Sequence, residues 1–374
     1  MLASPRSIAR RRPLLLALAL SCLPALGLLP GVANAKIVAK RVVAPGVVTE
    51  PVGFTFAPNG RLFVTSKSGS KVFIVDRQRE TRRVFASFTN VSSAGERGVL
   101  GVALHPDYPA TRYVYVYVVR RSTQDGPLQD QIVRLTDVGG KGRHLMKIWH
   151  VPVATRTNHN GGRIAFGPDD KLYAVVGDLG DDPARSQDLA DDRGKVLRME
   201  DDGSAPVDNP FAGSRVFSYG LRNSFGFGWD PRTGNLWETE NGPACNDELN
   251  LIQAGGNYAW GPSQTCAGAD PDNTNQDGPD RILPVRWFTP TIAATGLTFC
   301  DRCALGERSR GTFFFGASKN EQLRRARLNP ARDDIVDLDT VVSGLRVISV
   351  ETAPSGAIFF STFDQGIYKL VRKG

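Results

Sequence analysis

One phrase recurs along the chain and constrains the fold more than any other feature. It consists of an alternating apolar run, a turn built on proline with Asp, Asn or Gly, and a second alternating run. Each copy predicts two strands joined by a turn. Five copies are VGFTFAPNGRLFVTS (52–66), LGVALHPDYPATRYVYVYV (100–118), GRIAFGPDDKLYAVVGD (162–178), FGFGWDPRTGNLWETENG (225–242) and ISVETAPSGAIFFST (348–362).

The spacing of these copies predicts the architecture. The turn prolines are Pro58, Pro106, Pro168, Pro231 and Pro354, and the last gap is about twice the others. A degenerate copy, TIAATGLTFCDRCALGERSRGTFFFGAS, fills that gap, with its turn expanded around two cysteines. Six copies of roughly 55–60 residues without a long amphipathic helix predict an all-β fold, a six-bladed β-propeller. The alternative is a β-sandwich with accidentally similar hairpins, which the recurrence of one phrase disfavours.

The N-terminus has the pattern of a secretory signal peptide over residues 1–35. Three arginines at 10–12 precede the apolar stretch LLLALALSCLPALGLL, and Ala-Asn-Ala at 33–35 gives a small-x-small cleavage pattern. The stretch is short and interrupted, which disfavours a retained membrane helix. We therefore expect one propeller domain over residues 36–374, secreted or periplasmic, with no transmembrane segment after cleavage.

The charge of the chain is modest once this segment is set aside. The formal net charge is +8, and four of the arginines lie in the signal peptide, so about +4 remains after cleavage. Basic residues elsewhere alternate with acidic ones, and no basic stripe carries aromatics. Nucleic acid is therefore not expected as a partner.

Four cysteines remain after cleavage, an even number that favours disulfides in an exported chain. Three pairings are possible on paper. We prefer the local pairs, Cys245 with Cys266 and Cys300 with Cys303. A zinc site is the alternative, but these spacings match no usual zinc motif.

Polar and glycine-rich segments lie beside the hairpins, where the loops of a propeller build binding sites. The segments are GERGVLGVALHPDY (95–108), NHNGGRIAFGPD (158–169), SYGLRNSFGFGWDP (218–231), ENGPACNDELNLIQAGGNYAWG (240–261) and SGLRVISVETAPSG (343–356). The motifs G-L-R-N, G-P-x-x-x-D-E-L-N-L-I and G-N-Y-x-W are specific in that order. Together the segments resemble the pyrroloquinoline quinone (PQQ) dependent sugar dehydrogenases, the glucose/sorbosone and aldose sugar dehydrogenase family, over nearly the whole mature chain.

The resemblance implies that His159 is the general base. It would take the hydroxyl proton from the anomeric carbon of an aldose while hydride passes to PQQ, giving the lactone. A histidine suits this role because it titrates near neutrality. Gly161 and Gly162 would allow close approach of backbone and substrate. The alternative is a structural histidine that caps a loop.

The resemblance also implies a cofactor site. Arg222 and Asn223 match the pair that holds PQQ, and an arginine fork suits its carboxylate or quinone oxygens. Lys319, in F-G-A-S-K, matches a lysine that contacts the cofactor. Arg346 matches the first of two arginines near the last blade. The alternative for Arg222 is an ion pair with a neighbouring acid.

The sequence departs from the family pattern at several of these positions. Ile348 occupies the place of the second arginine and Ser349 that of the acid after it, which removes one charge-assisted contact to the cofactor. Glu96 stands where some members have a glutamine near the sugar. Asn158 stands where some have an aspartate before the base, so His159 would lose a possible charged orienting partner.

Calcium is implied by resemblance alone. One Ca²⁺ would bridge quinone and protein through the main-chain oxygens of Gly242 and Pro243. Such a hard cation prefers oxygen ligands and would polarise the quinone. A second, structural ion would involve Glu248 and the carbonyl of Tyr258. The acidic segment 178–188 is expected to be a solvated loop.

The partners expected are a small-molecule sugar and an external electron acceptor, since no haem or flavin motif is present. The oligomeric state would be a monomer or homodimer. Two other classes of function remain open. One is a calcium-dependent lactonase on a similar propeller, and the other is a cofactor-free propeller that binds glycans or proteins.

Overall fold

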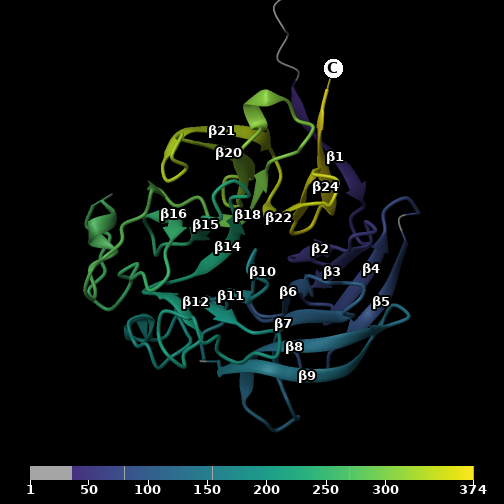
Figure 1. Ribbon diagram of the computed structural model, residues 1–374, viewed down its shortest axis with the longest axis horizontal. Coiled ribbons are helices and arrows are strands. Elements are labelled where there is room, and N and C mark those ends of the chain that lie inside the picture. The colour runs from purple at the N-terminus through teal and green to yellow at the C-terminus, as the bar shows by residue number, and fades with distance from the viewer. Residues whose placement is uncertain (1–35, 80, 154, 269, 374) are drawn as a thin grey trace, which may run out of the picture. The chain divides into compact units, whose positions relative to one another are not determined.

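Six four-stranded antiparallel sheets make up the fold in the computed structural model, which describes residues 36–79, 81–153, 155–268 and 270–373. The sheets are arranged around a common centre as the blades of a propeller (Figure 1). The prediction of an all-β, six-bladed β-propeller is therefore confirmed. The predicted signal peptide, residues 1–35, lies outside the described residues.

Each blade runs outward from a strand at the centre. Blade 1 consists of β2 (Phe54–Phe56), β3 (Leu62–Ser66), β4 (Lys71–Asp76) and β5 (Thr81–Ser87). Blade 2 consists of β6 (Val99–Leu104), β7 (Tyr113–Arg121), β8 (Leu128–Val138) and β9 (Lys141–Pro152). Blade 3 consists of β10 (Ile164–Phe166), β11 (Leu172–Val176), β12 (Lys195–Met199) and β13 (Val216–Tyr219). Blade 4 consists of β14 (Ser224–Trp229), β15 (Leu236–Glu240), β16 (Asp247–Ile252) and β17 (Arg286–Phe288). Blade 5 is β18 (Ala294–Cys300), β19 (Thr312–Ala317), β20 (Gln322–Leu328), β21 (Ile335–Ser343).

The last blade is completed by the first strand of the described chain. Its order is β1 (Ile37–Val43), β24 (Ile367–Arg372), β23 (Ile358–Thr362) and β22 (Val347–Thr352). β1 and β24 pair antiparallel, with Ile37 opposite Arg372 and Ala39 opposite Leu370, so the two strands lie side by side in Figure 1. The repeat pattern had not predicted this closure.

The hydrophobic core lies between the blades. In β7 the side chains from Val114 to Val119 are buried throughout, because both faces of the sheet pack against neighbours. One cluster joins Phe63 and Val72 of blade 1 to Val114 and Val116 of blade 2. This double-sided burial explains why the second strand of a hairpin reads as a nearly continuous apolar run.

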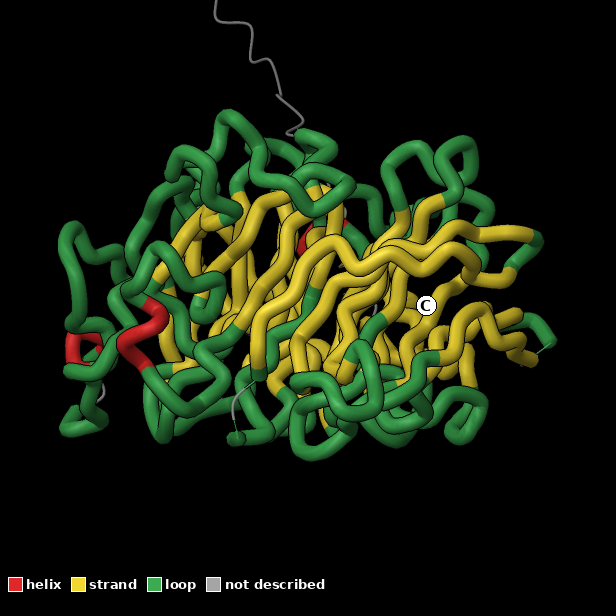
Figure 2. The backbone as a smooth tube through the Cα atoms, turned by 90° about the horizontal axis from the view of Figure 1, so that it is seen from below, coloured by secondary structure: helices red, strands yellow, loops and turns green. Residues whose placement is uncertain are grey.

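Among the described residues, three short 3₁₀ helices interrupt the loops, at Pro183–Ser186, Pro271–Asn273 and Glu307–Ser309. In the described part of the chain, no helix has the length and apolarity needed to cross a membrane. Loops and turns cover both ends of the strands (Figure 2).

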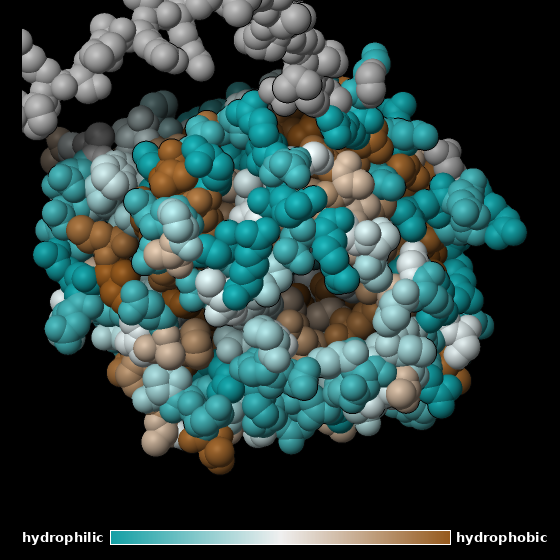
Figure 3. All heavy atoms as spheres, turned by 45° about the horizontal axis from the view of Figure 1, so that its top comes forward, coloured by the Kyte–Doolittle hydropathy of each residue, from teal (hydrophilic) through white to brown (hydrophobic). Residues whose placement is uncertain are grey.

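Because the strands of each blade are antiparallel, different connections lie at the two ends of the strands. The turns between first and second strands and between third and fourth strands lie at one end, the turn face. The loops between second and third strands and the segments that lead into each blade lie at the other end, the loop face. One face of the molecule is hollowed, with hydrophobic residues in its depth and hydrophilic residues on its rim (Figure 3).

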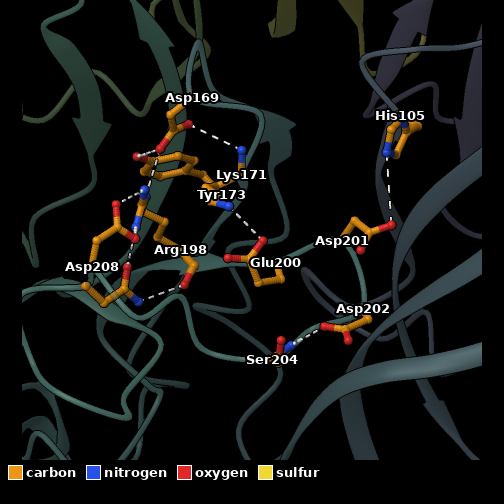
Figure 4. A network of polar contacts seen from close by, with 11 residues as sticks. His105, Asp169, Lys171, Tyr173, Arg198, Glu200, Asp201, Asp202, Ser204 and Asp208 are labelled. Atoms are coloured by element: carbon orange, nitrogen blue, oxygen red, sulfur yellow. Dashed lines mark hydrogen bonds and ion pairs between the residues drawn. The ribbon is translucent and has the colours of Figure 1, made fainter.

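A polar network on the turn face secures blade 3. Arg198, in β12, donates from Nε to Asp169 Oδ2 at 2.8 Å and from Nη1 to Asp208 Oδ1 at 2.8 Å (Figure 4). Its hydrogen bonds to Asp208 and Asp169 raise the pKa of the guanidinium above its usual range. The buried side chain thus ties the β10–β11 turn to the segment after β12.

We expect the substitution Arg198→Met to lower the free energy of unfolding by about 2 kcal/mol, because it removes hydrogen bonds to two charged partners. Urea unfolding measures this change. The control is Arg79→Met, whose ion pair with Asp76 is exposed and should contribute little to the free energy of unfolding. Equal losses in the two variants would contradict a stabilising role for the network.

Candidate active site

A cavity of about 340 Å³ opens on the loop face between the first strands of several blades. It brings together six of the predicted site residues: Glu96, His159, Arg222, Asn223, Gly242 and Pro243. A larger groove of about 1070 Å³ lies beside the β2–β3 and β4–β5 turns and contains none of the predicted residues. The remaining wall of the smaller cavity consists of Phe225, Asn241, Asp247, Thr291, Ala293, Thr295, Ser318 and Ile348.

His159 is held in this wall by two carboxylates. Its Nδ1 lies 2.6 Å from Asp178 Oδ1, and its backbone N–H donates to Glu96 Oε2 at 2.7 Å. The residue adopts φ of 59°, a left-handed conformation that non-glycine residues seldom adopt. The surrounding contacts therefore impose one position on the histidine, which the segment alone would not favour.

Asp178 corrects two expectations from the sequence. The segment 178–188 was expected to be a solvated loop, yet Asp178 is only 1% exposed. The absence of an acid at Asn158 was expected to leave His159 without a charged partner, yet Asp178 supplies one from the end of β11. Its oxygens also accept from Gly180 N at 2.7 Å and Trp260 Nε1 at 2.9 Å.

These contacts keep Asp178 ionised. Burial opposes its charged form, but the hydrogen bond with His159 and the amide of Gly180 outweigh burial and hold the pKa of the carboxyl below its usual range. A carboxylate at Nδ1 favours the tautomer with the proton on that nitrogen. Nε2 of His159 then has a lone pair that can accept a proton.

The segment after His159 is anchored by a buried polar cluster. Asn160 Nδ2 donates to Asp130 Oδ1 at 3.0 Å, and Tyr117 O–H lies 3.0 Å from Asn160 O. Gly161 and Gly162 have φ of 63° and 98°. A Cβ on Gly161 would lie 2.4 Å from Val175 O, so the Gly-Gly pair lets this segment pack directly against β11.

Arg222 links the cavity to the buried acids behind it. Its Nη1 donates to the carbonyls of Asn241 and Gly242 at 2.8 and 2.9 Å, and its backbone N–H donates to Glu240. The guanidinium carbon lies 5.3 Å from the ring centroid of Trp260, the residue that also contacts Asp178. The G-L-R-N and G-N-Y-x-W segments therefore meet at one place.

Asn223 presents an unsatisfied group at the same wall. Its side-chain oxygen is buried and has no hydrogen-bond partner among the described residues. A buried acceptor without a donor is costly unless a ligand or water completes it. Together with Arg222, it favours a ligand that carries both anionic and hydrogen-bonding groups.

Comparison with known proteins shows the family of the chain. The family model described as Glucose / Sorbosone dehydrogenase matches residues 48–372. The chain belongs to this family. It is 25% identical over 332 residues to the aldose sugar dehydrogenase YliI of Escherichia coli (strain K12), covering 83% of this chain and 86% of that protein.

Two further family members are similar to the chain. It is 30% identical over 253 residues to quinoprotein glucose dehydrogenase B of Acinetobacter calcoaceticus, covering 59% of this chain and 52% of that protein. The PQQ-bound structure of aldose sugar dehydrogenase from Streptomyces coelicolor matches with a TM-score of 0.74 and 31% identity, covering 90% and 98% of the two chains.

Other residues implied by the family lie outside the cavity wall. Lys319 Nζ donates to Thr291 Oγ1 at 3.1 Å, beside the wall residues Thr291 and Ser318. Arg346 lies over the ring of Phe363 at 5.5 Å and lines a neighbouring cavity. Asn158 precedes His159 without lining either cavity.

The residues around Gly242 fit a hard cation through main-chain oxygens only. Gly242 O accepts from Arg222 Nη1 at 2.9 Å, and a carbonyl has a second lone pair. Asp247 is occupied by backbone amides, since Oδ1 accepts from Gly242 N and Oδ2 from Ile292 N. In the described ranges, no group of three or more His, Cys, Asp or Glu side chains could hold a metal ion.

Glu248 and Tyr258, implied for a second ion, lie behind the cavity. Glu248 Oε1 accepts from Asn275 Nδ2 at 3.0 Å. The side-chain O–H of Tyr258 donates to Leu251 O at 2.6 Å and does not involve the carbonyl implied as a ligand.

The cysteines pair as preferred from the sequence. Cys245 is bonded to Cys266 and Cys300 to Cys303, with Cα separations of 5.8 and 5.2 Å. The first bond crosslinks the loop that carries Gly242 and Pro243.

Proposed function

We propose that this protein is an exported, PQQ-dependent dehydrogenase that oxidises an aldose at its anomeric carbon to the lactone. The observation that carries the proposal is His159, held by Asp178, in the wall of a cavity that is also lined by Arg222 and by Asn223, whose buried side-chain oxygen has no partner among the described residues. The named sugar and quinoprotein dehydrogenases of the family support the same reaction.

In this proposal His159 removes the anomeric hydroxyl proton through Nε2. Asp178 holds the ring by Nδ1 and stabilises the positive charge that the ring acquires. When bound, PQQ supplies the acceptor for the hydride that leaves the anomeric carbon. An external acceptor would take up the two electrons that the sugar loses.

Arg222 and Asn223 would hold the cofactor, with Lys319 and Arg346 at the edges of the site. The arginine offers a charged fork for a carboxylate or quinone oxygen, and the asparagine an acceptor that lacks a donor. Glu96, on the same wall, would contact the sugar. Ca²⁺ would be held by the carbonyls of Gly242 and Pro243, and a structural ion by Glu248 and Tyr258.

A cofactor-free propeller that binds glycans or proteins is the second candidate. Ile348 favours it, because an apolar side chain lines the cavity at the place of a cofactor arginine. The two functions differ in whether the protein binds PQQ.

We expect the protein to take up PQQ stoichiometrically in the presence of Ca²⁺, and quinone absorbance measures this uptake. We also expect the loaded protein to reduce an artificial dye when an aldose is added. Arg222→Met should weaken PQQ binding by at least about tenfold, because it removes a charge-assisted contact. Arg79→Met, an exposed residue, is the matched control. Failure of the wild-type protein to take up PQQ would overturn the dehydrogenase and favour the binding propeller.

A further inference from the structure

A second cavity of about 180 Å³ borders the candidate active site. The two cavities share Glu96, Phe225 and Ile348. At this size the second cavity accommodates one end of a ligand rather than a whole cofactor. Its own wall consists of Val52, Lys67, Gly95, Leu100, Gly161, Gly162, Arg163, Arg346 and Phe363.

Lys67 is a buried cation with few partners. It lies directly after β3 and is 7% exposed. Among the described residues, its ammonium group has one hydrogen-bond acceptor, Ser93 O at 3.1 Å. An ammonium has three N–H donors, so two are left for a ligand or water.

Arg163 is a second buried cation with incomplete contacts. It is 8% exposed, and its Nη2 donates to Val52 O at 3.4 Å, near the limit of a hydrogen bond. Nη1 lies 3.9 Å from Glu351 Oε1, beyond hydrogen-bonding distance. Burial lowers the pKa of this guanidinium, and the nearby carboxylate of Glu351 opposes the shift without cancelling it.

The charge of the cavity wall is predominantly positive. Lys67, Arg163 and Arg346 face a single lining carboxylate, Glu96, one oxygen of which accepts from His159 N at 2.7 Å. The walls between them are apolar, including Val52 and Leu100. Cations in such a low-dielectric site interact more strongly with an anion than they would in water.

We propose that Lys67 and Arg163 form a carboxylate-binding subsite beside the candidate active site. The inference rests on the proposed function, because the carboxylate belongs to one of two ligands of that reaction. It is either a carboxylate of PQQ or that of an acidic aldose, a uronic acid. In both cases the subsite provides positive charge near Ile348, where the family arginine is absent.

The test measures binding to the cofactor-free protein by calorimetry. Three ligands are compared: D-galacturonate, D-galactose, which lacks the carboxylate, and PQQ with Ca²⁺. Lys67→Met removes the charge with little change in volume, and Lys67→Arg restores it. Lys40→Met, at an exposed position on β1, is the matched control. This design needs no substitution of Arg163.

A uronate source predicts that galacturonate binds about tenfold more tightly than galactose and that Lys67→Met abolishes the difference. A cofactor source predicts that Lys67→Met weakens PQQ binding about tenfold and leaves both sugars unchanged. Lys67→Arg should recover most of either loss. The subsite is wrong if Lys67→Met changes neither affinity, or if Lys40→Met has the same effect. Dye reduction with neutral aldoses tests the dehydrogenase separately, since galacturonate binding does not require turnover.

Discussion

Replacing His159 by glutamine is expected to lower kcat for aldose oxidation by about 10³-fold. Glutamine can accept a hydrogen bond but cannot take a proton at neutral pH, so the hydroxyl proton would have no base. PQQ affinity should change little, because Arg222 and Asn223 remain. Steady-state dye reduction and a PQQ titration on the same variant measure the two effects.

The control for this variant is His105→Gln. His105 lies at the β6–β7 turn on the turn face, where its Nδ1 accepts from Asp107 N. Its replacement should leave kcat unchanged. Full activity in His159→Gln would mean that another group accepts the proton. A parallel loss of PQQ binding would mean that His159 acts through the structure of the cavity.

The second large effect is expected for Asp178→Asn, which should lower kcat by as much as about 10⁴-fold. The amide cannot neutralise the imidazolium, and its NH₂ group can turn the ring to the tautomer in which Nε2 carries the proton. Nε2 would then be unable to accept a proton from the sugar. The variant differs from wild type by one atom, so the cavity should retain its shape and bind PQQ normally.

Asp182→Asn is the matched control for this second variant. Asp182 lies in the same acidic segment and accepts from Ala184 N at an exposed position. It should retain wild-type kcat and KM. If Asp178→Asn kept its kcat, the hydrogen bond to His159 would be structural only, and the proposed role of Asp178 would be wrong.

The fold could be predicted because a propeller repeats one local structure, a hairpin of two strands joined by a turn. Each hairpin carries its own signal, such as the turn at Pro168 between β10 and β11, and the degenerate copy retains its strand pattern around Cys300 and Cys303. The pairing of β1 with β24 is different, since it joins segments from the two ends of the described chain. No local pattern reports such a contact.

The candidate site was predicted only where a family motif covers it. Asp178 was missed because its role depends on contacts with His159 and with Trp260, which is 82 residues away and belongs to a long excursion between β16 and β17. One signal was present. Asp178 lies two residues beyond β11, the second strand of a hairpin, and the antiparallel order brings this position to the same end as the segment before β10.

Lys67 lies in the corresponding loop of blade 1, directly after β3. Its burial could not be predicted, because an isolated lysine at a strand end is usually solvated. The excess of positive charge in the wall of its cavity depends on residues from three separate blades. Only the assembled ring defines it.

The pairing of β1 with β24 has a consequence for biosynthesis. A ribosome makes β1 among the first residues of the described chain and β24 among the last, so β1 must wait for nearly the whole chain before it finds its partner. Until then both its edge and that of blade 6 can pair with other chains. Ring closure is therefore a late, long-range event in folding, and a chain interrupted before β24 would leave the circle of blades open.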